Sequence, residues 1–160
     1  MSEPHLLVTK FTIPPLRVKL LPRVALIERL NQNCTLPLVL LSAGAGFGKT
    51  TLLAAWANQS SYPVAWLSLN HLDNDPQHFW RGIIAALRTR LPTVGDAALA
   101  QLQAPQPPQL VPLLTSLINE LAALGEETVL VVDDYHVIEE QAIHVSLAFL
   151  LDHAPPACTW

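Results

Sequence analysis

Residues 43–51 of this 160-residue chain read AGAGFGKTT, and this stretch decides the fold. Four residues separate the small residue Ala43 from Gly48-Lys49-Thr50, which is the spacing of a phosphate-binding P-loop, with alanine where the strict pattern has glycine. Glycines in such a loop let successive backbone N–H groups point into one concavity and surround phosphate oxygens. We therefore expect the phosphate site to consist of Ala43, Gly44, Ala45, Gly46, Phe47, Gly48, Lys49, Thr50 and Thr51.

Two side chains of this loop have separate roles in the expected chemistry. Lys49 should reach the outer phosphates, and the Thr50 hydroxyl should help to coordinate Mg²⁺. The positive end of the helix that starts near Lys49 should add to the attraction for phosphate. The alternative is a glycine-rich turn that binds no ligand, but the stretch follows a predicted strand and opens a predicted helix, as phosphate binding requires.

The second informative stretch is residues 129–134, VLVVDD, an apolar strand that ends in two carboxylates. Asp133 is placed to hold Mg²⁺ through water, and Asp134 is the candidate for orienting the water that attacks the terminal phosphate. The structural alternative is a turn or helix-capping aspartate, which is the commoner situation for a single aspartate after a strand.

The remaining pattern alternates apolar strands with amphipathic helices, so it predicts an α/β fold with a parallel sheet. Ligands bind at the carboxyl ends of such strands, where the glycine loop and the aspartates lie. We expect an extended segment over 1–22, a loop over 104–108, and a cap at Asp75 with Pro76 opening the next helix. The predicted strands are 37–42, 64–69 and 128–132, and further helices are predicted over 23–30, after Lys49, 110–124 (ended by Gly125) and 140–151.

Composition narrows the function classes. The chain is 51% hydrophobic and 14% charged with a net charge of −4, which excludes disorder and argues against binding a nucleic acid backbone. Its two cysteines, Cys34 and Cys158, form neither a disulfide framework nor a metal-ligand spacing, and we expect both to be reduced. No secretory signal and no run of roughly 18 apolar residues is present, so a cytoplasmic protein without membrane contact is expected.

Other candidate sites are weaker. The six histidines show no zinc spacing, and residues 70–76 lack the ligand ladder of a calcium loop. His136 follows the paired aspartates closely enough to sense a terminal phosphate or an adjacent subunit, and a structural hydrogen bond is the alternative.

These motifs, taken in order, resemble the N-terminal nucleotide-binding domain of the MalT-like LuxR-type regulators, which are signal transduction ATPases with numerous domains (STAND). The resemblance rests on five stretches and covers most of the chain: 7–10, 21–23, 43–51, 64–69 with 73–75, and 132–136. It implies a three-layer P-loop NTPase of the additional-strand class. It also implies a switch in which ADP holds the inactive state, inducer and ATP drive self-oligomerisation, and slow hydrolysis resets it.

The resemblance assigns the same roles to Lys49, Thr50, Asp133 and Asp134, and it places Arg23 near the nucleotide. Family members continue into helical repeats and a DNA-binding helix-turn-helix that this sequence lacks. We therefore expect residues 1–35 to form an extended segment with a short helix and 36–160 a partial P-loop domain, truncated before completion.

In that class a further strand lies between the strand entering the P-loop and the strand ending in Asp133, and residues 157–160 look like the approach to it. Because unpaired buried backbone groups cost about 1–3 kcal/mol each, we expect the 160 residues alone to be poorly stable, with little or no ATPase activity. DNA would be bound only through the absent part.

Two other functions stay open. A small P-loop kinase would use Asp134 to activate an acceptor hydroxyl and would need an arginine-rich lid, for which only Arg81, Arg88 and Arg90 follow the P-loop. A nucleotide-binding module without turnover would need neither.

Overall fold

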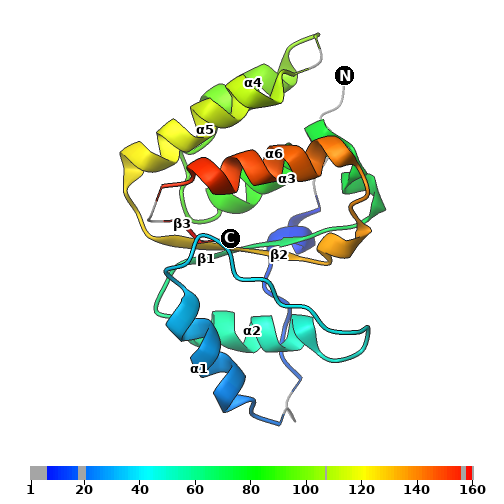
Figure 1. Ribbon diagram of the computed structural model, residues 1–160, viewed down its shortest axis with the longest axis vertical. Helices are drawn as coiled ribbons and strands as arrows, with labels where there is room; N and C mark the ends of the chain where they lie inside the picture. The colour runs from blue at the N-terminus through cyan, green and yellow to red at the C-terminus, as the bar shows by residue number, and fades with distance from the viewer. Residues whose placement is uncertain (1–6, 18–20, 107, 156–157, 160) are drawn as a thin grey trace.

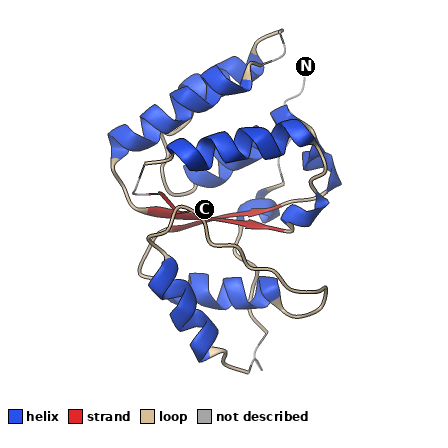
Figure 2. Ribbon diagram, viewed as in Figure 1, coloured by secondary structure: helices blue, strands red, loops and turns tan. Residues whose placement is uncertain are grey.

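The computed structural model describes residues 7–17, 21–106, 108–155 and 158–159. A parallel sheet forms the middle layer, with helices on both faces (Figures 1 and 2). Its strands are β1 (Val64–Ser68), β2 (Thr128–Asp133) and β3 (Cys158–Thr159), hydrogen-bonded in the order β1-β2-β3. On one face lie α1 (Val24–Asn33) and α2 (Lys49–Gln59); on the other lie α3 (Pro76–Arg88), α4 (Asp96–Gln103), α5 (Leu110–Leu124) and α6 (Gln141–His153).

Alternation along the strands divides the apolar residues between two cores. In β1, Ala65 and Leu67 join the larger cluster beneath α3–α6, whereas Val64 and Trp66 join the smaller cluster beneath α1 and α2. The register pairs Val64 with Val129 and Ser68 with Asp133, so neighbouring residues of β2 alternate in the same way. Both faces of β1 and β2 are therefore buried, which explains why these strands have no polar face, as the sequence predicted.

The start of α3 and the end of α5 lie where the sequence predicted them. The Asp75 carboxylate accepts a hydrogen bond from the His78 N–H at 2.9 Å, with Pro76 at the start of α3. Gly125 ends α5 in the left-handed conformation, with φ of 61°. Both predicted boundaries are confirmed. Among the described residues, no helix is long and apolar enough to cross a membrane.

The strand predicted over 37–42 is wrong. Residues 38–44 have no regular secondary structure, and Leu40 is 80% exposed. A parallel strand needs a hydrogen-bonded neighbour, but the edge of β2 that lies opposite β1 carries β3 at Thr128 and Val129 only. After Val129, no strand among the described residues pairs with this edge of β2, so residues 37–42 have no strand beside which to pair.

Two further differences have tertiary causes. The segment expected to be extended contains a 3₁₀ turn, η1 (Val8–Phe11), and α4 was not predicted. The side chain of Lys10, on η1, is drawn into a buried contact described below. The start of α4 is held from α5, because the Glu120 carboxylate accepts hydrogen bonds from the backbone N–H groups of Gly95 and Ala97. The partner of Lys10 and the partner of the start of α4 are both too far away in sequence for a local pattern to predict them.

Truncating a core residue of α5 should destabilise the protein far more than truncating an exposed residue of the same helix. Leu117 is fully buried, so Leu117→Ala should lower the free energy of unfolding by about 2–5 kcal/mol. Val111 is 57% exposed, so Val111→Ala should change it by less than about 0.5 kcal/mol. Urea unfolding followed by circular dichroism measures both; equal losses would contradict this description of the core.

Candidate functional site

The carboxyl end of β2 meets the start of α2. The Thr50 hydroxyl donates a hydrogen bond of 2.8 Å to Asp133 Oδ2, although the two residues are 83 positions apart. Asp133 is buried, and its other oxygen accepts the backbone N–H of Asp134 at 3.0 Å. The structure therefore brings together the two side chains that the sequence assigned to one metal ion.

The loop between the apolar segment 38–43 and α2 makes a tight turn. Gly46 and Gly48 have φ values of 80° and 75°, in the left-handed region that favours glycine. The Phe47 N–H donates to the Gly44 carbonyl at 3.4 Å, and α2 begins immediately afterwards at Lys49. This loop and helix start have the form that the phosphate-binding prediction requires.

The ammonium group of Lys49 lies within the loop. Its Nζ donates to the carbonyl oxygens of Ala43 at 2.6 Å and Gly44 at 3.0 Å. The positive charge is thus held over the turn, at the N-terminal end of α2, where a bound phosphate would meet it. Phe47 and Thr51 are exposed, so neither is fixed by the core.

Arg23 also reaches this loop, as the resemblance implied. Its Nη1 donates to the Phe47 carbonyl at 2.9 Å, and its Nη2 lies 3.5 Å from where a Cβ on Gly48 would stand. The guanidinium group therefore adds a second positive charge beside the turn. It comes from the residue that precedes α1.

Asp134 and His136 lie just past the end of β2, in and before the 3₁₀ turn η3 (Tyr135–Val137). Among the described residues, Asp134 alone combines a side chain with a positive φ, 61°. His136 Nδ1 is 3.9 Å from Asp134 Oδ1; the His136 side chain is largely exposed and that of Asp134 is half-exposed. Asp134 and His136 are therefore free of the core and share one rim with Asp133.

Tyr135, between Asp134 and His136, is anchored by contacts with α3 and α6. The Tyr135 hydroxyl lies 2.7 Å from His144 Nδ1, on α6, and its ring packs edge-on against Phe79. Burial raises the pKa of Tyr135 above its usual 10.0, so the hydroxyl stays protonated and can donate to His144. Sequence reasoning missed this pair, because nothing in a nine-residue separation indicates contact.

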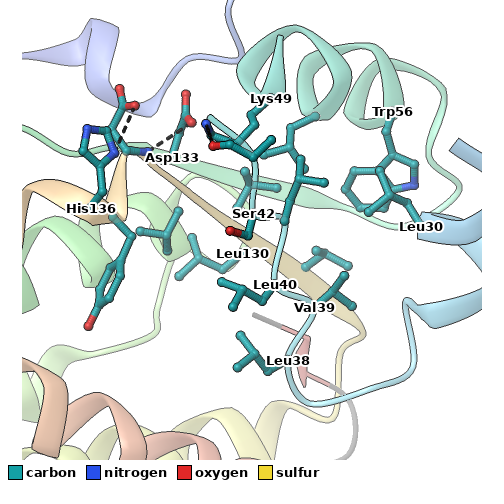
Figure 3. Close-up of a pocket in the computed structure, with 18 of the residues that line it drawn as sticks. Leu30, Leu38, Val39, Leu40, Ser42, Lys49, Trp56, Leu130, Asp133 and His136 are labelled. Atoms are coloured by element: carbon teal, nitrogen blue, oxygen red, sulfur yellow. Dashed lines mark hydrogen bonds and ion pairs between the residues drawn. The ribbon is translucent and has the colours of Figure 1, made fainter. Parts of the chain in front are cut away.

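Lys49, Asp133, Asp134 and His136 are among the residues that line a cavity of about 550 Å³. Figure 3 shows Lys49, Asp133 and His136 towards one end of it, and Leu38, Val39 and Leu40 along the other. The apolar end is the space between segment 38–43 and β2, where the predicted strand pairing did not form. This single cavity therefore has charged side chains at one end and apolar side chains at the other.

The donor set suits Mg²⁺ better than a transition metal. Thr50 and Asp133 offer oxygen ligands, and Mg²⁺ usually takes one or two protein oxygens together with phosphate and water. Among the described residues, no group of three or more His, Cys, Asp or Glu side chains could hold a metal. A metal here would depend on a phosphate ligand.

The three arginines that a kinase lid would need are engaged elsewhere. Arg81 donates to the Leu102 carbonyl at 2.7 Å, and Arg90 donates to the Val64 carbonyl at 2.8 Å. Arg88 donates to the Val94 carbonyl and pairs with Asp96. Arg81 thus ties α3 to α4, Arg88 ties α3 to the connection before α4, and Arg90 contacts the first residue of β1.

Removing the Thr50 hydroxyl should destabilise the protein even without ligand. Thr50→Val leaves one oxygen of the buried Asp133 carboxylate without its donor, so the free energy of unfolding should fall by about 1–3 kcal/mol. Thr51→Val, on the exposed side of the same helix, should change it by less than about 0.5 kcal/mol. Urea titration distinguishes the two, and equal effects would mean that the Thr50 bond contributes nothing.

The sequence of this chain is similar to those of known proteins. The HTH-type transcriptional regulators MalT of Cronobacter sakazakii and Yersinia enterocolitica are each 36% identical to it over 139 residues, and that of Klebsiella pneumoniae is 35% identical over 137. The aligned region is 86% of this chain but 15% of those proteins, and the chain resembles their N-terminal region. Residues 20–158 match the family model described as AAA ATPase domain, for which a P-loop NTPase fold and nucleotide binding are implied. The chain belongs to the AAA ATPase domain family.

Proposed function

We propose that this chain is the ATP- and ADP-binding switch domain of a MalT-like LuxR-type transcriptional regulator. The observation that carries the proposal is the Thr50–Asp133 hydrogen bond, which joins the P-loop to the acidic end of β2 beside Lys49. A phosphate chain lying on residues 43–51 would then face both a cation and a metal-holding carboxylate. The likeness to the MalT regulators supports the regulatory context.

Each residue has a distinct task in this proposal. The backbone N–H groups of the loop and the Lys49 ammonium bind the phosphates, and Arg23 contributes charge from the side of α1. Thr50 and Asp133 hold Mg²⁺, which neutralises phosphate charge when bound. Asp134 orients the water that attacks the terminal phosphate, accepting its proton as the P–O bond breaks. Its exposure leaves it free to meet that water.

The proposal extends to the whole protein. The parallel sheet order, with β3 beside β2, is compatible with the additional-strand class of P-loop proteins, in which residues 36–160 would be part of the domain. In the complete regulator we expect slow hydrolysis, oligomerisation with other copies of the chain, and DNA binding through a separate helix-turn-helix. The relatives are named as HTH-type regulators and are several times longer.

A nucleotide-binding module without turnover is the second candidate, since Thr50, Asp133 and Lys49 alone would suffice for it. The exposed Asp134, placed at the same rim, favours turnover. A kinase is disfavoured because Arg81, Arg88 and Arg90 are all engaged in structural hydrogen bonds.

Lys49→Ala should weaken binding of ATP and ADP by roughly 100-fold or more, because a charge-assisted contact to phosphate disappears. Arg29→Ala, which removes an exposed positive charge on α1, should leave both affinities within about twofold. Titration calorimetry with each nucleotide and Mg²⁺ measures this. Phosphate release, with and without Lys49→Ala in a chain extended past Trp160, separates a hydrolysing switch from a passive module.

Nucleotide affinity that survives Lys49→Ala would overturn the phosphate site. Lys49-dependent binding without any phosphate release from the extended chain would leave the passive module as the function.

A further inference from the structure

Asn74 makes an unusual set of contacts at a distance from the P-loop. Its Oδ1 accepts hydrogen bonds of 2.9 Å from the backbone N–H groups of both Glu139 and Glu140, and its Nδ2 donates to the Val137 carbonyl at 3.2 Å. All three partners belong to residues 137–140, from the last residue of η3 to the residue before α6. One side chain therefore satisfies three backbone groups of the segment that follows Asp134 and His136.

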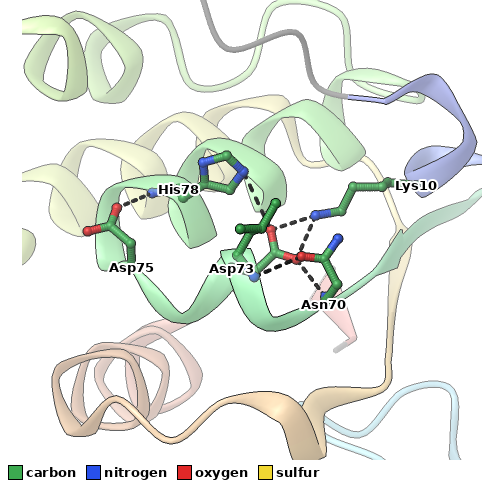
Figure 4. A network of polar contacts seen from close by, with 6 residues as sticks. Lys10, Asn70, Asp73, Asp75 and His78 are labelled. Atoms are coloured by element: carbon green, nitrogen blue, oxygen red, sulfur yellow. Dashed lines mark hydrogen bonds and ion pairs between the residues drawn. The ribbon is translucent and has the colours of Figure 1, made fainter.

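Asn74 is itself held in place by its neighbour. Asp73 is fully buried, and both of its oxygens lie 2.6 Å from Lys10 Nζ (Figure 4). Its Oδ2 also accepts the Asn70 N–H at 2.7 Å, and His78 Nε2 lies 3.8 Å from its Oδ1. These contacts fix the 3₁₀ turn η2 (His71–Asn74), which ends in Asn74. Breaking a buried ion pair of this kind is costly, since it would leave an unpaired buried charge.

The segment that Asn74 holds starts from a conformation that needs support. Asp134 has a φ of 61°, in the left-handed region that residues with a side chain rarely adopt. The turn after it is closed by hydrogen bonds from the Val137 N–H to the Asp134 carbonyl and from the Ile138 N–H to the Tyr135 carbonyl. Asp133 fixes one end through the Asp134 N–H, and Asn74 fixes the other.

We propose that Asn74 is a positioning residue for the terminal-phosphate end of the site: it holds residues 137–140 so that the carboxylate of Asp134 stays aimed at the attacking water. Lys10 and Asp73 support Asn74 in this task. The inference rests on the proposed function, because it needs a terminal phosphate beside Asp134. Asn74 touches neither Lys49 nor the P-loop in any contact of the described residues, so it should act on the chemical step and not on phosphate binding.

The test is Asn74→Leu in the chain extended past Trp160, assayed by single-turnover phosphate release from ATP and by calorimetry with ADP. We expect the rate of release to fall about 10- to 100-fold, since displacing a catalytic group by about 1 Å costs that much. Affinity for ADP with Mg²⁺ should stay within about twofold. Asn74→Asp keeps the oxygen that accepts from Glu139 and Glu140 but loses the donor to the Val137 carbonyl, so it should recover part of the rate lost in Asn74→Leu.

A matched control removes an amide side chain elsewhere. Asn119 is exposed on α5, so Asn119→Ala should change neither the rate of release nor the affinity for ADP. Loss of rate in this control would attribute the Asn74 effect to general damage and overturn the inference.

A double-mutant cycle decides whether Asn74 acts through Asp134. In an Asp134→Asn background, Asn74→Leu should cause almost no further loss, because the carboxylate that it positions is already gone. Additive losses, an unchanged rate in Asn74→Leu, or equal loss of ADP affinity would each overturn the inference. Hydrogen exchange supplies an independent check, since Asn74→Leu should deprotect the Glu139 and Glu140 amides.

Failure of this inference differs from failure of the proposed function. If Lys49→Ala abolishes nucleotide binding but Asn74→Leu leaves the rate unchanged, only the role of Asn74 is wrong. If Lys49→Ala has no effect on binding, the proposed function falls, and the role of Asn74 falls with it.

Discussion

The hydrogen bond between Thr50 and Asp133 is the contact on which the rest of the site depends. It connects the first turn of α2, on one face of the sheet, to the carboxyl end of β2 within the sheet. Asp133 uses both oxygens, one for the Thr50 hydroxyl and one for the Asp134 N–H, so the same carboxylate also fixes the turn into η3. A buried carboxylate held in this way has little freedom to move, and both halves of the proposed nucleotide site take their positions from it.

The sheet can support this contact because it is packed on both faces. Two tryptophans stabilise the smaller core: Trp56 donates to the Asn31 side chain at 2.8 Å and so ties α2 to α1, while Trp66 donates to Ser68 Oγ at 2.9 Å within β1. The larger core fixes β2 from the opposite face. The P-loop and the acidic end of β2 are thus supported by two separate apolar clusters. Because both clusters pack against the same sheet, the two parts of the site are held in fixed positions relative to each other.

The N-terminal part of the chain meets the site region at two distant points. Arg23 contacts the P-loop carbonyl of Phe47, and Lys10 reaches the buried Asp73, next to Asn74. Residues that precede the P-loop in sequence are therefore in contact with that loop and with the turn η2 that carries Asn74. We expect removal of the segment before α1 to loosen both the P-loop and η2.

Sequence alone predicted the turn of residues 43–51, the acidic end of β2 and the helix boundaries at Asp75 and Gly125, because glycine conformation, capping and apolar periodicity are local properties. The parallel pairing of β1 and β2 also followed from pattern. The strand predicted over 37–42 was wrong, because pairing depends on a neighbour and not on apolar content. Only the tertiary structure revealed Lys10 on Asp73, Tyr135 beside His144, and Asn74 on residues 137–140. Each joins residues far apart along the chain or with no shared pattern, and such contacts are decided by packing.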